Sequence, residues 1–126
     1  MKKYNADETP DATDWLAAGE DERIEAVRAY HRRLRVRLPT ERLHATIHMI
    51  VENQLAAGEA AVVDTFERLE REGLNRHEAI HAIGKVLAEH IYDLLHDAAP
   101  DPGEDVNTAY FEALRQLTAE DWRNAG

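Results

Sequence analysis

Apolar residues recur every three or four positions along most of this chain, the periodicity of helices that bury one face. The clearest stripe follows Asn75, which suits an N-cap, and continues to about Asp97. Its apolar positions are Ile80, Ile83, Leu87, Ile91, Leu94 and Leu95. A second stripe runs from an N-cap at Thr40 to about Ala57, through Leu43, Ile47, Ile50, Val51 and Leu55. We predict a helix over each range.

The same spacing predicts three further helices, over about residues 22–36, 59–72 and 106–117, and a single turn at Trp15-Leu16. Gly58 ends one helix, and Gly73, followed by apolar Leu74, suits the end of the next. Connectors of two or three residues fold consecutive helices back on each other. No stretch alternates in the manner of a strand. The predicted fold is therefore all-α, a compact bundle of about five helices.

The segments outside these helices are polar or rich in proline. Residues 1–12 include Pro10 and predict a loose N-terminal arm, whereas AAPDPGED at 98–105 predicts a loop before the last helix. Trp122 lies in a short tail that we expect to dock on the body. A chain of 126 residues suits a single helical domain, residues 1–126.

Charge and composition exclude several classes of function. A net charge of −10 and a pI near 5.1 argue against a nucleic-acid partner, because phosphate binding needs a clustered positive surface. The absence of cysteine excludes disulfides and thiolate chemistry. The first residues, MKKYNADETP, do not resemble a secretory signal, and no apolar run approaches the ~20 residues of a membrane span. We expect a soluble cytoplasmic protein, and an exposed apolar edge at Trp122 or Tyr110 would favour a homodimer.

Seven histidines without any cysteine turn attention to metal chemistry through imidazole and carboxylate ligands. His44, His48 and Glu52 recur every four residues, and His77 and His81 repeat that spacing on the helix predicted from Asn75. Each pair lies on the shoulder of an apolar stripe. If the two shoulders meet, they form a site of three or four nitrogens, with Glu52 as an oxygen ligand or as a partner that orients a ring. Zinc and non-haem iron both suit such a ligand set.

Residues 77–81 read HEAIH, a match to the zinc-hydrolase pattern H-E-x-x-H. In that interpretation Glu78 is the catalytic general base that acts on a metal-bound water. Asn75 and Glu78 also fit a capping box, which explains the glutamate without chemistry. The motif opens its helix, and the downstream carboxylates lie beyond a proline loop, so we favour the capping box and a protein that is not an enzyme.

Three other features carry weaker expectations. Gln54 falls near the centre of an apolar face, where it is predicted to bond a neighbouring backbone group or a histidine ring. Gly84, inside a helix, predicts a close contact with another helix or with a ligand. His31, His90 and His96 have no partner at helical spacing and are interpreted as solvated or core-edge residues.

The segments HATIHMIVENQL (44–55) and EGLNRHEAIHAIG (72–84) resemble a family of small bacterial proteins recorded as a domain of unknown function. The resemblance covers about residues 40–96. It implies a bacterial, soluble, helical protein, and it brings no activity or cofactor. It supports treating the histidines of both segments, with Glu52 and Glu78, as one constellation.

Three functions therefore compete. The first is a metal-binding protein with a histidine-rich site between two helices. The second is a helical interaction or oligomerisation module whose histidines are structural. The third is an H-E-x-x-H metal-dependent hydrolase.

Overall fold

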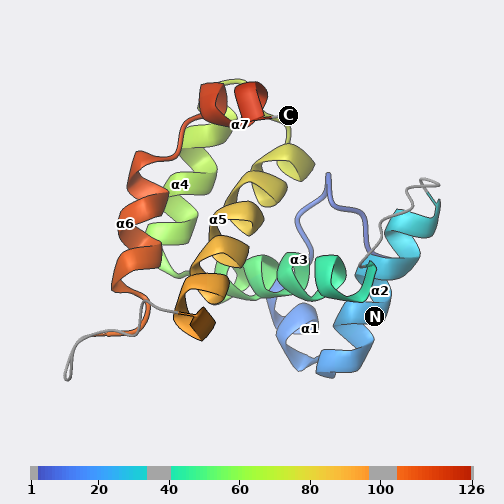
Figure 1. Cartoon of the computed structure of the whole chain (residues 1–126). Helices are drawn as coiled ribbons and strands as arrows, with labels where there is room; N and C mark the ends of the chain where they lie inside the picture. The colour runs from blue at the N-terminus through green and yellow to red at the C-terminus, as the bar shows by residue number, and fades with distance from the viewer. Residues whose placement is uncertain (1–2, 34–40, 97–104, 126) are drawn as a thin grey trace.

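A computed structural model describes residues 3–33, 41–96 and 105–125 of the chain. Within these ranges every regular element is a helix, which confirms the predicted all-α class (Figure 1). The helices are α1 (Ala12–Ala17), α2 (Glu20–Arg33), α3 (Glu41–Ala56), α4 (Ala60–Arg71), α5 (Arg76–His96), α6 (Thr108–Gln116) and α7 (Ala119–Ala125).

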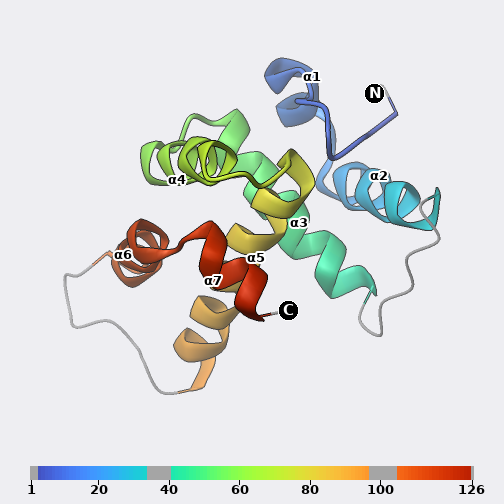
Figure 2. The same cartoon turned by 90° about the horizontal axis from the view of Figure 1, so that it is seen from above.

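Helix α3 is the central element, packed against α2 on one side and α5 on the other (Figure 2). The first apolar core lies between the N-terminal arm, α1, α2 and α3, and it contains Trp15, Val27 and Met49. The second lies among α4, α5, α6 and the end of α3, and contains Leu69 and Ile83. The two cores meet along α3, which contributes side chains to both. Side chains of α3 that face α2 or α5 therefore lie near the boundary between the cores.

The turns on either side of α4 explain why neighbouring helices fold back so sharply. Gly58 and Gly73 have φ of 72° and 105°, a left-handed conformation that favours glycine. The Leu74 N–H donates to the Leu69 carbonyl at 3.1 Å, and the Gly73 N–H donates to the Glu70 carbonyl at 3.0 Å. These two bonds form a Schellman motif, so Gly73 is the predicted C′ glycine. Leu74 is buried, as expected of the residue that follows.

Helices α3 and α5 approach each other closely at Gly84. A Cβ atom built on Gly84 would lie 3.2 Å from Cγ2 of Ile47, so even an alanine here would require the Ile47 side chain to move by a few tenths of an ångström. The close helix contact predicted for Gly84 is confirmed. This contact holds the facing surfaces of α3 and α5 at short range.

Several expectations about the ends of the chain were wrong. The N-terminal arm is not loose where it is described, because Tyr4 and Ala6 are 4% and 0% exposed. By contrast, the tail around Trp122 docks on the body as expected, because Trp122 packs against the second core from a seventh helix, α7. Tyr110 is fully buried and offers no apolar edge to a second copy.

Leu43 and Leu95, predicted as core positions, are 60% and 77% exposed. Both lie towards the ends of their helices, where the neighbouring helices no longer cover them. The predicted end of the 22–36 helix and nearly all of the 98–105 loop fall outside the described residues. None of the described helices is long and apolar enough to cross a membrane.

Candidate metal centre

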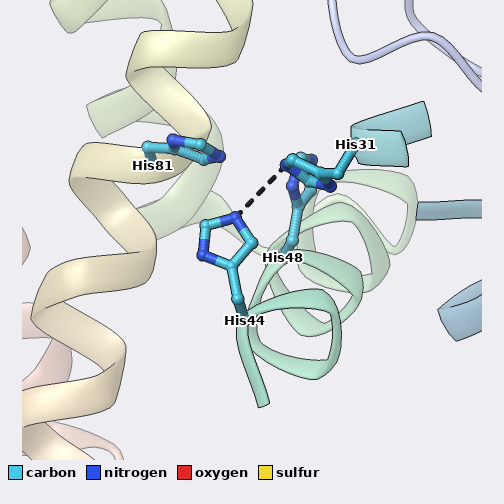
Figure 3. Close-up of side chains that lie close together, drawn as sticks. All are labelled: His31, His44, His48 and His81. Atoms are coloured by element: carbon cyan, nitrogen blue, oxygen red, sulfur yellow. Dashed lines mark hydrogen bonds between the residues drawn. The ribbon is translucent and has the colours of Figure 1, made fainter. Parts of the chain in front are cut away.

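Five histidines from three helices gather where the two cores meet. They are His31 on α2, His44 and His48 on α3, and His77 and His81 on α5. For four of them, His31, His44, His48 and His81, one ring nitrogen each lies within 4.8 Å of all the others (Figure 3). This buried four-histidine cluster could hold a metal ion.

The histidine pairs of α3 and α5 do face each other. The ring centroids of His44 and His81 are 4.7 Å apart, and those of His48 and His81 are 5.4 Å apart. Because residues four apart lie on one side of a helix, each pair presents both rings to the opposite helix. The predicted meeting of these two helix shoulders is confirmed.

His77 borders the cluster without being one of its four closest members. Its ring centroid lies 4.1 Å from that of His81 and 5.7 Å from that of His48. Its backbone N–H, in the first turn of α5, donates to Asp7 of the N-terminal arm at 3.4 Å. His77 is therefore a fifth imidazole at the edge of the four.

His31 belongs to the cluster, although it has no partner at helical spacing along the chain. It is 2% exposed, so the interpretation as a solvated or core-edge residue was wrong. Its Nδ1–H donates to the Val27 carbonyl at 2.9 Å, which leaves the Nε2 lone pair facing Nε2 of His44 at 3.2 Å. A signal was present: His31 continues the core stripe of α2 through Ile24 and Val27, where a polar ring is unexpected.

The tautomer of His48 is fixed by a chain of hydrogen bonds that starts at the N-terminal arm. The Tyr4 hydroxyl donates its single proton to Oε2 of Glu52 at 2.5 Å. It must therefore accept at its other contact, so His48 Nε2–H donates to it at 2.7 Å. Nδ1 of His48 keeps its lone pair. A hydrogen bond of this kind, from the nitrogen opposite the ligating one, is what orients metal-bound histidines.

Glu52 takes part in a buried ion pair rather than presenting a free carboxylate to the cluster. Arg76 donates to both of its oxygens, at 2.7 and 2.8 Å, and also to the Ala6 carbonyl at 2.8 Å. Burial, followed by the negative charge of Glu52, raises the pKa of Tyr4 well above its ordinary value, so the hydroxyl stays protonated. Glu52 thus acts on His48 through Tyr4.

Two nitrogens of the cluster, His48 Nδ1 and His81 Nε2, are buried without any hydrogen-bond partner among the described residues. The same is true of Nε2 of His77 at the edge of the cluster. A buried polar atom without a partner costs roughly 1–3 kcal/mol. Burial, followed by neighbouring imidazoles, lowers the pKa of His81 to about 3 and that of His44 to about 4. The rings are therefore neutral at pH 7, which is the form that binds metal ions.

The spacing of the nitrogens suits a transition metal ion. Four nitrogens at about 2.0–2.1 Å from a tetrahedral ion lie about 3.3 Å from one another. The Nε2 atoms of His31 and His44 are 3.2 Å apart, close to that value. One nitrogen from each of the four rings lies within 4.8 Å of the others, so the group could hold a metal ion.

Glu78, the candidate general base, is occupied in capping α5. Its carboxylate accepts from the Asn75 N–H at 3.0 Å, and its own N–H donates to the Asn75 side chain at 2.8 Å. Both bonds of the predicted capping box are present. The H-E-x-x-H motif therefore contributes His81 to the cluster and His77 to its edge, while its glutamate caps the N-terminus of α5.

The remaining polar candidates lie away from the cluster. Gln54 accepts a hydrogen bond from the Tyr110 hydroxyl at 2.7 Å, so its partner is a tyrosine rather than the predicted backbone group or histidine. His90 stacks on Tyr110, with ring centroids 5.6 Å apart. His96 stacks on Tyr92 near the end of α5. His90 and His96 are consequently natural comparison residues for the five clustered histidines.

No family model, curated protein or solved structure matches this chain. The resemblance of residues 40–96 to a family of small bacterial proteins stays a prediction. What the chain does must be argued from its own side chains.

Proposed function

We propose that this protein binds a divalent transition metal ion through His31, His44, His48 and His81. His77 adjoins this set as a fifth imidazole. The proposal is supported by the convergence of ligand nitrogens from α2, α3 and α5 within 4.8 Å. It is also supported by the two hydrogen bonds that leave His31 Nε2 and His48 Nδ1 as lone pairs.

The unpaired nitrogens are the observation that carries this proposal over a purely structural role. Histidines that only bridge helices would satisfy one another by hydrogen bonds. Here a single imidazole–imidazole hydrogen bond, between His31 and His44, is found among the described residues. Three buried ring nitrogens have no hydrogen-bond partner among the described residues, and a metal ion would give each of those it binds a partner.

Imidazole ligands suit zinc and non-haem iron alike. The cluster contains no sulfur, because the chain has no cysteine, and the nearest buried carboxylate, Glu52, is bonded to Arg76 and Tyr4. An all-nitrogen site of this kind is the ion environment that we propose, and elemental analysis will identify the ion.

Elemental analysis of untagged protein tests the proposal. We expect about one transition metal ion per chain, since the four ligands form one site. Changing His48→Ala together with His81→Ala should remove the ion, because α3 and α5 then each lose a ligand and only two of the four remain.

The matched control changes two histidines of α5 that lie outside the cluster, His90→Ala together with His96→Ala. This variant should keep its metal. Metal-free native protein of normal stability that also takes up no zinc or iron would contradict the proposal and favour an interaction module with structural histidines.

A further inference from the structure

An apolar pocket of about 300 Å³ opens beside the histidine cluster, between α3 and α5. Three of the four proposed ligands, His44, His48 and His81, line it. His31 does not. A small molecule in this pocket would therefore approach an ion held by the four rings from the side of His44, His48 and His81.

Beyond the histidines and Lys85, the residues that line the pocket are apolar, and two of those on α5 are small. Ile47 and Ile80 contribute aliphatic surface, and Trp122 of α7 adds an indole whose ring centroid is 6.5 Å from that of His81. Gly84 and Ala88 lie one helical turn apart on α5 and present little side-chain volume to the pocket. Pockets near this volume are at the lower end of those that hold small organic ligands.

The charge at the site favours an anionic ligand. Four neutral imidazoles leave the full double positive charge of a divalent ion without compensation, and an uncompensated buried charge is costly. Glu52, the nearest buried carboxylate, is already paired with Arg76. Lys85, the charged residue of the pocket lining, is a cation and adds to the attraction for an anion.

We propose that this pocket binds a small molecule with a short apolar tail and an anionic oxygen head group that coordinates the metal ion. This inference rests on the proposed metal site. The head group lies against the histidines as a fifth ligand, so that the ion expands from four-coordinate to five-coordinate when the molecule binds. The tail lies along Ile47, Ile80 and Trp122.

Cobalt(II)-loaded protein, titrated with alkyl hydroxamates from acetohydroxamate to octanohydroxamate, tests this. Binding of the head group should change the visible absorption of the cobalt ion. Affinity should rise roughly threefold to fourfold for each added methylene until the pocket is full, because each methylene leaves water for an apolar wall.

A pocket-filling substitution separates the tail from the head group. Ala88 is exposed to the pocket, so Ala88→Leu should fold normally while occupying space that the tail needs. We expect it to weaken octanohydroxamate at least tenfold and to leave acetohydroxamate and cobalt binding unchanged. Ala113→Leu, at an exposed alanine of α6 outside the pocket, should change neither affinity.

The outcomes distinguish this inference from the proposed function. Protein that binds no cobalt contradicts both. Stoichiometric cobalt with equal affinity for every chain length overturns the pocket proposal alone. Octanohydroxamate that binds metal-free protein equally well, measured by tryptophan fluorescence, overturns the claim that the head group coordinates the ion.

Discussion

Two polar clusters lie next to each other in the interior, and they differ in how far the chain satisfies them. In the first, Arg76, Glu52 and Tyr4 bond one another, and Arg76 Cζ also lies 5.6 Å from the ring centroid of Phe66. Only Nε of Arg76 lacks a hydrogen-bond partner there among the described residues. In the second, five imidazoles share a single hydrogen bond with one another among those residues.

The difference indicates two separate roles. Because both oxygens of Glu52 are bonded within the chain, the ion pair has no need of a ligand, and its task is to hold the N-terminal arm against α3 and α5. The histidine cluster keeps buried ring nitrogens that have no hydrogen-bond partner in the described chain. Tyr4 joins the two, since it bonds both Glu52 and His48. The first cluster thereby positions the second.

Removing one partner of the ion pair should have the largest effect on stability. Arg76→Met leaves Glu52 as a buried carboxylate without its cation, and we expect a loss of about 3–5 kcal/mol in the free energy of unfolding. Urea denaturation of metal-free protein measures it. Adding Glu52→Leu should restore much of the loss. Arg115→Met, which breaks the exposed pair with Glu112, should cost less than about 1 kcal/mol, and an equal effect of both substitutions would contradict the comparison.

Acid is the next largest perturbation, because it acts on all the clustered histidines together. Burial lowers the pKa of each ring, to about 4 for His44 and about 3 for His81. The unfolded chain takes up protons below about pH 6.5 that the folded chain cannot accept, so stability is lost as the pH falls. The melting temperature of metal-free protein should drop between about pH 7.5 and about pH 5.5, a window above the titration of ordinary carboxylates.

The control for this pH dependence is His90→Ala together with His96→Ala, which should retain the full drop. The His48→Ala, His81→Ala variant should show a smaller one. A melting temperature that is flat across this window in the native protein would show that the clustered rings are not held neutral.

Tyr4→Phe should weaken metal binding about tenfold to a hundredfold, because the hydroxyl that fixes the His48 tautomer is lost. Competition with a metal chelator measures the affinity. Tyr110→Phe is the matched control, since it removes a buried hydroxyl that bonds Gln54 and leaves the cluster intact. Equal affinities for the two variants would mean that Tyr4 does not position His48.

The smallest expected effect is on stability, where one substitution should stabilise the metal-free protein and destabilise the metal-loaded protein. His81→Leu removes an unpaired buried nitrogen, so metal-free protein should gain about 1 kcal/mol of stability. The same variant should lose the stabilisation that added metal gives the native protein. His90→Leu also removes an unpaired buried nitrogen from α5 and should keep the metal response. A destabilised metal-free His81→Leu protein would show that this ring is structural.

Sequence periodicity was sufficient for the five longer helices, α2 to α6, and for four of the five clustered histidines. His44, His48, His77 and His81 repeat at helical spacing, so their meeting required only that α3 and α5 pack together. The small Gly84 indicated that contact. His31 has no such repeat, and its place in the cluster depends on how α2 lies against α3, which periodicity within one helix does not determine.

The N-terminal arm was the least predictable region. A polar stretch with a proline is typical of a loose segment, yet Tyr4 is buried because Glu52 and His48 offer it two bonds 44 or more residues away in the chain. Glu52 was expected to be a ligand or an orienting partner of the histidines. Its pairing with Arg76 could not be foreseen, because that arginine stands directly before the H-E-x-x-H motif, 24 residues from Glu52, and no spacing within one helix relates the two.

X-ray absorption spectroscopy at the metal edge of zinc-loaded, untagged protein would decide whether these histidines form a metal site. We expect a shell of nitrogen at about 2.0–2.1 Å, with the outer scattering of at least four imidazole rings, and any oxygen as one additional ligand. We expect the double variant, His48→Ala with His81→Ala, to lose this imidazole signal. A spectrum dominated by oxygen, with two imidazoles or fewer, would contradict the metal centre proposed for α2, α3 and α5.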